Sequence, residues 1–294
     1  MITSFIAAVL PVMVIALLGA LLSRKTSYLD DPNLPQLILN VGMPCLLLHS
    51  MLNSHIDFMN MGKLLVGAIL TLLAMVFVTF IFLKLMRLQP KYYLPVLVNP
   101  NTGNLGIPIA YALLGEKGLA GAVIISSIIE ISHFTLGVGM MSGSFNLKRI
   151  LANPPVISLI VGAMILSVDL PIPDFVIQVL SMLGNITVPI MLLMLGRSLA
   201  HMRVKEANWL KLSVLAVYRP AIGIAMAWFV ASLLGLSPLY TANLVIACSM
   251  PVAVLNYILV TRYQGPVNDV AGLTFLTLPT VLFALIFIQV MVIS

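Results

Sequence analysis

Polar and helix-breaking residues interrupt an otherwise apolar stretch, LVNPNTGNLGIPIAYALL, at residues 97–114. Three asparagines, two prolines and two glycines fall within the ten positions from Asn99 to Pro108. Proline removes a backbone donor and clashes with the preceding turn, and glycine adds backbone freedom. A helix interrupted here would leave free N–H groups and a partial positive charge at its new end. The chemistry that this stretch predicts is binding of an anion to backbone dipoles.

A second interruption of the same kind is predicted at residues 248–257, CSMPVAVLNY. Two broken helices in corresponding halves of a membrane protein point to a transport site. The alternative is that both are ordinary proline kinks, with asparagines joining neighbouring helices. We predict one substrate site that draws on both stretches, made of Asn101, Thr102, Gly103, Asn104, Pro108, Pro251 and Asn256. The first break itself is predicted to be formed by Asn99, Pro100 and Gly106.

Glu130 and His133 stand three residues apart inside an apolar segment, and therefore on one face of a helix. Proton carriers within membranes are built from such side chains. We predict that these two residues couple transport to protons; the alternative is a hydrogen-bonded pair that joins helices. A di-iron site would need a second E-x-x-H motif, so neither a metal nor a cofactor is expected.

Arg219 also stands inside an apolar segment, where a cation needs a partner. That partner is either a carboxylate of the substrate or Glu130. A third alternative is that the side chain reaches back to the membrane surface. We place Arg219 among the substrate-binding residues as the counter-charge of an anion.

Composition indicates which elements position these residues. Of 294 residues, 61% are hydrophobic and 8% are charged, whereas about a quarter of a soluble domain is charged. We therefore predict an all-α protein embedded in the lipid bilayer, with its net charge of +6 in loops rather than in a nucleic-acid-binding patch. Runs of about 20 apolar residues predict ten spans: 2–22, 33–52, 62–84, 92–114, 118–142, 154–168, 174–199, 209–234, 238–261 and 267–293.

Basic residues orient these spans, because an excess of Lys and Arg marks cytoplasmic loops. Twelve of the 15 basic residues lie at or after the ends of odd-numbered spans: Arg24, Lys25, Lys84, Arg87, Lys91, Lys148, Arg149, Arg197, Arg203, Lys205, Lys211 and Arg262. Both termini are therefore predicted on the outer side of the plasma (cell inner) membrane.

Residues of the first half recur at the same spacing about 145 positions later. Asn40 and Pro44 correspond to Asn185 and Pro189, and Pro108 corresponds to Pro251. Each half contains five predicted spans, an odd number, so the second copy would cross the membrane in the opposite sense. We predict two inverted five-helix repeats, residues 1–147 and 148–294, with broken helices at about 92–114 and 238–261. The two Asn–Pro pairs are predicted to be structural; lining of the cavity is the alternative.

The segment from Pro100 to Ile109, followed by Leu114-Gly115, resembles the fourth-span motif of the auxin efflux carrier family. Met250-Pro-Val-Ala-Val, Thr261-Arg-Tyr263 and Thr277-Leu-Pro279 resemble its C-terminal pattern. That family includes plant auxin exporters and bacterial malate and malonate permeases. The resemblance implies ten helices in two inverted repeats, with helices 4 and 9 broken and crossing, and export or uptake of an organic anion. A homodimer is expected by analogy alone.

These patterns together predict a secondary active transporter for a small organic anion, with a carboxylate as the expected class. The coupling ion is expected to be H⁺, with Na⁺ as the alternative, and a passive channel or facilitator is the main rival. No nucleotide-binding G-x-x-x-x-G-K-[ST] motif is present, so the energy is expected to come from an ion gradient or from the gradient of the substrate itself. An enzyme is not expected, because the chain has no H-E-x-x-H motif and neither Asp169 nor Asp174 lies deep in a predicted span.

Overall fold

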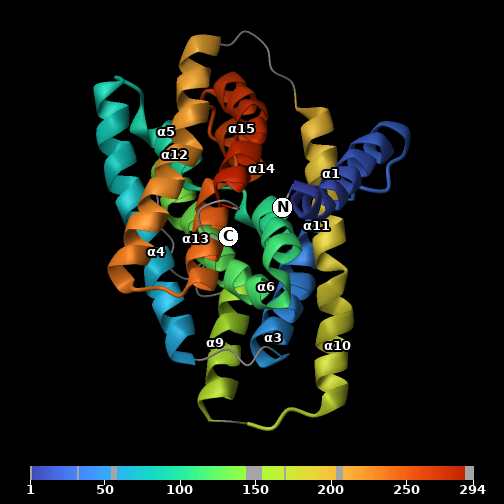
Figure 1. The fold of residues 1–294 in the computed structure, drawn as a ribbon. Helices are drawn as coiled ribbons and strands as arrows, with labels where there is room; N and C mark the ends of the chain where they lie inside the picture. The colour runs from blue at the N-terminus through green and yellow to red at the C-terminus, as the bar shows by residue number, and fades with distance from the viewer. Residues whose placement is uncertain are drawn as a thin grey trace.

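The computed structural model describes residues 2–31, 33–53, 58–143, 154–168, 170–202 and 208–288. Every regular element within these ranges is helical, so the predicted all-α fold is confirmed there (Figure 1). The first half contains α1 (Ile2–Lys25), α2 (Asn33–Leu37), η1 (Ile38–Gly42), α3 (Met43–Asn53), α4 (Phe58–Leu85), α5 (Pro90–Val98), η2 (Thr102–Gly106), α6 (Ile107–Ser132), η3 (His133–Gly137) and α7 (Val138–Ser142), where η marks a π-helical turn. The second half contains α9 (Pro154–Ser167), α10 (Asp174–Asn185), α11 (Thr187–His201), α12 (Trp209–Leu234), α13 (Pro238–Ser249), α14 (Val254–Arg262) and α15 (Val267–Ile288).

The helices lie where the apolar runs predict them. Four continuous helical stretches in the described residues are long and apolar enough to cross a membrane: Gly62–Leu85, Thr102–Ser142, Asp174–His201 and Trp209–Leu234. The second of these is 41 residues long, but it changes direction at Gly115, where φ is 67° and ψ is −160°. Only glycine adopts such a φ without strain, so Gly115 separates the segments predicted at 92–114 and 118–142.

Turns recur in the same order in the two halves. Arg87 has a φ of 54° and stands three residues before Pro90, the first residue of α5. Gly235 has a φ of 59° and stands three residues before Pro238, the first residue of α13. Later in each half a second positive φ follows the broken helix, at Gly115 and at Gln264. The local backbone therefore repeats along with the sequence pattern.

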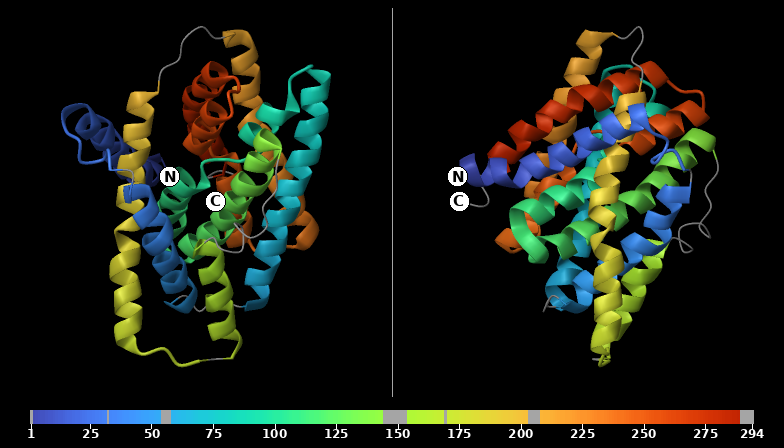
Figure 2. Two further views of the ribbon diagram at one scale, coloured as in Figure 1. Left: turned by 180° about the vertical axis from the view of Figure 1, so that it is seen from behind. Right: turned by 90° about the vertical axis from the view of Figure 1, so that its right-hand side faces the viewer.

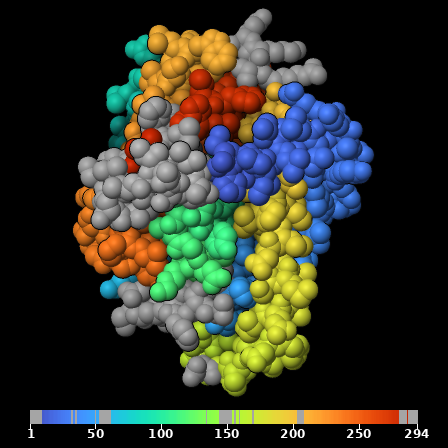
Figure 3. Space-filling model, turned by 45° about the vertical axis from the view of Figure 1, so that its right-hand side comes forward, coloured from blue at the N-terminus to red at the C-terminus, as the bar shows by residue number. Residues whose placement is uncertain are grey.

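The helices form two groups that pack mainly within themselves. The first contains α1, α3, α9, α10 and α11, which lie mostly on the right and along the bottom in Figure 1; the second contains α4, α5, α6, α12, α13, α14 and α15. We call these the α1–α11 bundle and the α4–α15 bundle, and the further views of Figure 2 show the same division. In Figure 3 α1 lies against α11, and a Cβ atom on Gly196 of α11 would come within 1.7 Å of the Ala16 carbonyl oxygen in α1. The two bundles meet where η2 and α6 pack against α11, α1 and α3.

Candidate functional site

Two interrupted helices meet in the α4–α15 bundle, at a place that we call the crossing. Helix α5 ends at Val98 and α13 ends at Ser249, and the chain after each runs extended. Pro100 and Val252 form an antiparallel backbone bridge there. The Asn101 amide N–H donates to the Pro251 carbonyl oxygen at 2.8 Å. The predicted meeting of the two breaks is therefore observed, with the first break confined to residues 99–101.

A side chain of α14 satisfies the backbone carbonyl group that the first break leaves without its helical partner. In an uninterrupted helix the carbonyl oxygen of Asn99 would accept from the amide of Gly103. Instead it accepts from Nδ2 of Asn256 at 3.0 Å, and both asparagines are fully buried. An unpaired buried carbonyl would cost about 1–3 kcal/mol. Asn256, which lies in the first turn of α14, therefore stabilises the first break.

Side chains of α12 and α15 satisfy the backbone groups that the second break leaves without helical partners. In a continuous helix the amide of Val252 would donate to the carbonyl oxygen of Cys248. Here the Val252 amide donates to Oγ1 of Thr277 in α15 at 3.1 Å. The Cys248 carbonyl oxygen accepts from Nη1 of Arg219 in α12 at 2.9 Å. Side chains thus replace the helical bond that Pro251 and its neighbours leave open.

The helices that restart after the breaks have uncapped N-termini. Asn101 precedes η2, which continues into α6, and Ala253 precedes α14; neither side chain accepts a capping hydrogen bond. By contrast, Asn208 caps α12 and Ser237 caps α13. The Thr102 amide donates to the Pro100 carbonyl oxygen at 2.9 Å, but the helix dipole at such ends still favours negative charge. Two of these ends at one crossing make a site that suits an anion.

Several buried polar atoms at the crossing have no partner within the described residues. They are Nδ2 and Oδ1 of Asn99, Oδ1 of Asn256, and Nε and Nη2 of Arg219. Buried polar groups in proteins are almost always hydrogen-bonded. These atoms are therefore available to a ligand or to water.

One side of the crossing borders the α1–α11 bundle. Thr102 and Ser126 hydrogen-bond through their hydroxyl groups at 3.2 Å. A Cβ atom on Gly103 would lie 3.6 Å from Cε of Met191 in α11 and 3.7 Å from Oγ of Ser126. Gly103 and Asn104 are half-buried, whereas Asn101 and Thr102 are buried. The predicted binding residues 101–104 therefore lie together at the contact between bundles.

Pro108 is placed differently from the prediction. It is the second residue of α6, beyond the extended segment. Because η2 runs directly into α6, Pro108 stands one turn and a half inside the restarted helix, where its missing N–H removes a helical hydrogen bond. Gly106 belongs to η2, and a Cβ atom there would lie 3.3 Å from Cγ of Met250. Both residues belong to the restarted helix rather than to the extended segment between the helices.

Glu130 and His133 lie near the end of α6, where η3 packs against α5 and α14. His133 is buried; its Nδ1 lies 3.2 Å from the Ile129 carbonyl oxygen, and its Nε2 has no partner in the described residues. Glu130 is half-buried. The ion pairs found among the described residues do not join it to Arg219. Arg219 is fully buried, so it does not reach back to the membrane surface either.

The repeated Asn–Pro pairs lie apart from these contacts. Asn40, in η1, has an exposed side chain. Asn185 is also exposed, and its Nδ2 donates to Oγ of Ser181 one turn earlier in α10. Pro44 is half-buried and Pro189 is exposed. Their role as structural breaks stays a prediction; η1 and the junction of α10 with α11 are the irregular backbone next to them.

Two residues that contact the second break were not predicted as site residues from the sequence. Thr277 was singled out only as part of a motif, and Gly223 was not singled out at all. A Cβ atom on Gly223 would lie 1.8 Å from the Cys248 carbonyl oxygen, so only glycine lets α12 approach the end of α13 this closely. A glycine one turn after a buried arginine, and hydroxyl groups in apolar helices, are the signals that indicate such contacts.

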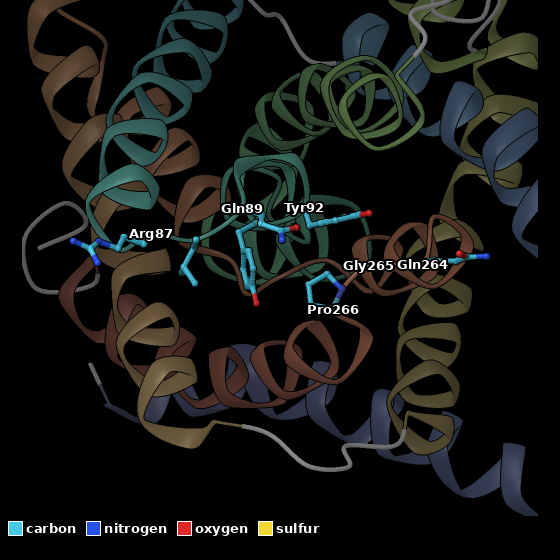
Figure 4. Close-up of a pocket in the computed structure, with 8 residues that line it drawn as sticks. Arg87, Gln89, Tyr92, Gln264, Gly265 and Pro266 are labelled. Atoms are coloured by element: carbon cyan, nitrogen blue, oxygen red, sulfur yellow. The ribbon is translucent and has the colours of Figure 1, made fainter.

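A separate cavity of about 500 Å³ lies at the far end of α5 from the crossing (Figure 4). Gln89, Tyr92 and Pro266 gather at its centre, while the side chains of Arg87 and Gln264 extend to opposite sides. Beside it, Tyr93 and Lys211 both hydrogen-bond to Asp269. These contacts tie α5 to α12 and α15 at the end remote from the break.

Comparison with known proteins identifies the family of the chain. The sequence profile of a family described as "Membrane transport protein" matches the chain twice, over residues 4–146 and 140–291. The chain belongs to this family of auxin efflux carrier-type transporters. An uncharacterized transporter of Methanocaldococcus jannaschii is 29% identical over 186 residues, which are 60% of this chain and 60% of that protein. The alignment thus covers less than two thirds of the relative.

Family membership confirms the resemblance carried by the motifs at residues 100–109 and 250–254. The family is one of membrane transport proteins and the relative is named as a transporter, so neither is an enzyme, as expected for this chain. The apolar helices are accordingly membrane elements.

Proposed function

We propose that this transporter moves a small organic anion, recognised by a carboxylate group, across the plasma membrane by secondary active transport. The observation that carries the proposal is the crossing of two interrupted helices whose restarted N-termini lack side-chain caps. Such ends inside a membrane protein favour anionic groups of a substrate. Asn101, Thr102, Gly103, Asn104 and Asn256 would contact the substrate, Pro108 and Pro251 would shape the pocket, and Arg219 would supply positive charge.

Two inverted five-helix repeats, 1–147 and 148–294, are the architecture that we propose around this site. The family profile matches the chain in two segments, 4–146 and 140–291, whose boundary lies close to the proposed boundary between the repeats. The recurring turns support the repeat independently, because Arg87 and Gly235 precede the two broken helices at the same spacing. Ten spans with both termini outside follow from this architecture and from the placement of Lys and Arg.

Alternating access would be a movement of one bundle against the other. The binding residues after the first break, in η2, pack against α11 of the opposite bundle. A substrate held there would be uncovered on one side or the other as the bundles rock. Glu130 and His133, on the segment that packs against both broken helices, are the proposed proton carriers.

Exchange in proteoliposomes tests the proposal. Purified protein would be loaded with unlabelled monocarboxylates or dicarboxylates, and counterflow of the labelled anion measured with and without a pH gradient. In vesicles without internal substrate, accumulation of the labelled anion above its outside concentration under an imposed pH gradient supports active transport, whereas equilibration alone identifies a passive facilitator. Uptake that does not depend on the pH gradient but requires Na⁺ would identify sodium, rather than protons, as the coupling ion.

Replacement of Asn101 and Asn104 together by Leu locates the site. We expect the double variant to lose anion binding while it keeps its melting temperature within a few degrees. Asn268→Leu, which removes an amide from an exposed position in α15, is the matched control and should exchange normally. Unchanged exchange by the folded double variant would place the site elsewhere.

A further inference from the structure

Arg219 carries its charge into the core of the α4–α15 bundle. It is the one Lys or Arg that is buried in the part of the chain that the structure describes, with 0% of its surface exposed. None of the ion pairs found among those residues includes it. A buried cation without a counter-ion is costly. A bound anion is therefore the partner that this residue most needs.

The free atoms of Arg219 have a particular geometry. Nη1 is engaged with the Cys248 carbonyl oxygen, whereas Nε and Nη2 have no partner in the described residues. Nε and Nη2 share one edge of the planar guanidinium, and their N–H groups point in the same direction. That edge matches the two oxygen atoms of a carboxylate, which it binds through two parallel hydrogen bonds. The occupied nitrogen meanwhile holds the end of α13.

The guanidinium lies next to the end of α13, where the chain leads into the crossing. Cys248 stands three residues before Pro251, whose carbonyl oxygen accepts the Asn101 N–H. Three residues of chain span at most about 10 Å. Arg219 therefore belongs to the same site as the two uncapped helix N-termini, and the rocking of the bundles would give a substrate access to it.

We propose that Arg219 is the charge-selecting residue of the transport site and binds the single carboxylate of a monocarboxylate substrate through Nε and Nη2. This inference rests on the transport function proposed above. A dicarboxylate would bring a second negative charge into a core that, within the described ranges, offers no second buried Lys or Arg. That second charge would meet only the partial positive charges of the two helix N-termini, and burying it without a full counter-ion is costly. Monoanions are therefore favoured over dianions of the same size.

Matched pairs of probes test this on the unmodified protein. Malonate and succinate each differ from their monoamides, malonamate and succinamate, by one charge at nearly constant size. Counterflow in proteoliposomes at neutral pH would compare each pair, with lactate and pyruvate as further monocarboxylates. We expect the monoamides to be exchanged at least about tenfold better than the dicarboxylates, as expected for one unpaired buried charge. A dicarboxylate exchanged better than its own monoamide overturns the inference but leaves the transport function standing.

Variants test the residue itself. Arg219→Gln should raise the KM for monocarboxylates at least about tenfold and abolish the preference within each pair. Arg219→Lys keeps the charge but loses the paired edge, so it should keep the preference at a weaker affinity. Arg197→Gln, which alters a partly exposed arginine paired with Asp30, is the control and should behave as wild type.

The outcomes separate the possible failures. Arg219→Gln with a lowered maximal rate but an unchanged KM and preference would mean that Arg219 only positions α13, and the inference fails. If Arg219→Gln does not fold, the comparison of matched pairs on the wild-type protein decides alone. If the wild-type protein exchanges no carboxylate at all, the proposed transport of carboxylates fails together with the inference.

Discussion

Asn256 is the side chain that joins the two interruptions. Its amide group donates to the Asn99 carbonyl oxygen, 157 positions earlier in the chain. Its own Oδ1 stays without a partner in the described structure. The amide nitrogen of Asn256 therefore stabilises the backbone, and its Oδ1 atom is available to a substrate. A single residue can in this way link binding to the shape of the site.

Asn256→Ala should weaken both stability and transport. The substitution leaves the Asn99 carbonyl unpaired in the core, which predicts a loss of about 1–2 kcal/mol in the free energy of unfolding. Thermal unfolding in detergent and counterflow in proteoliposomes measure the two effects. Asn268→Ala, at an exposed position of α15, provides the control. An Asn256→Ala protein with wild-type melting temperature would show that this bond contributes nothing.

Thr277 and Thr274 offer a matched pair of hydroxyl groups in α15. Thr277 accepts from the Val252 amide, whereas the hydrogen bond found for Thr274 is to Val270 in its own helix. Thr277→Val should therefore lower the melting temperature and the exchange rate more than Thr274→Val does, because only the first leaves an amide of the break unpaired. Equal effects of the two substitutions would contradict this account of the second break.

At the scale of elements, the crossing depends on how closely α12 approaches the end of α13. Gly223 is the point of contact, because any Cβ atom there would overlap the Cys248 carbonyl group. The same approach brings Arg219 to that carbonyl oxygen. The position of α12 thus fixes the end of the broken helix and the charge beside it.

Gly223→Ala should disturb this contact. The added methyl group must push α13 away from α12, which we expect to reduce transport several-fold and to destabilise the protein by about 1–3 kcal/mol. Gly62→Ala is the control, because a Cβ atom on Gly62 meets nothing within 4 Å. That substitution should be neutral or slightly stabilising, as alanine favours a helix over glycine. A Gly223→Ala protein that behaves like Gly62→Ala would contradict the close approach.

Much of this element pattern could be predicted from sequence. Apolar runs located the helices, and proline with asparagine at 99–101 and 250–256 located both breaks, since such residues are tolerated in a membrane helix only with special partners. Gly106 is predicted in the break but lies in the restarted helix, because a glycine alone does not reveal whether it ends one helix or belongs to the next. The sequence of one helix also does not tell which neighbour its side chains meet. Arg219 therefore had Glu130 as a candidate partner, whereas the structure pairs it with a carbonyl group of α13.

At the scale of the whole molecule, the account requires two bundles that move against each other. Their contact runs through η2 and α6 on one side and α11 on the other. Gly103 and Met191 face each other across it. The binding residues thus lie at a boundary that the transport cycle must open and close.

Cross-linking across this boundary should stop transport reversibly. Cysteines would replace Gly103 and Met191 in a protein whose native cysteines, Cys45 and Cys248, are changed to Ala, and a short, reducible bifunctional thiol reagent would join them. We expect counterflow to fall to background after cross-linking and to return after reduction, with each single-cysteine protein as the control. Full exchange by the cross-linked protein would show that the bundles need not separate there.

The central claim is that a carboxylate binds where the two interruptions cross. The most direct measurement is an experimental structure of the protein with 3-bromopropionate, in which anomalous scattering locates the bromine atom. The account predicts one bromine position beside Asn101 and Asn256, with the carboxylate toward Arg219. Two unbroken helices in place of the crossing, or bromine bound only in the cavity beside Tyr92, would contradict it.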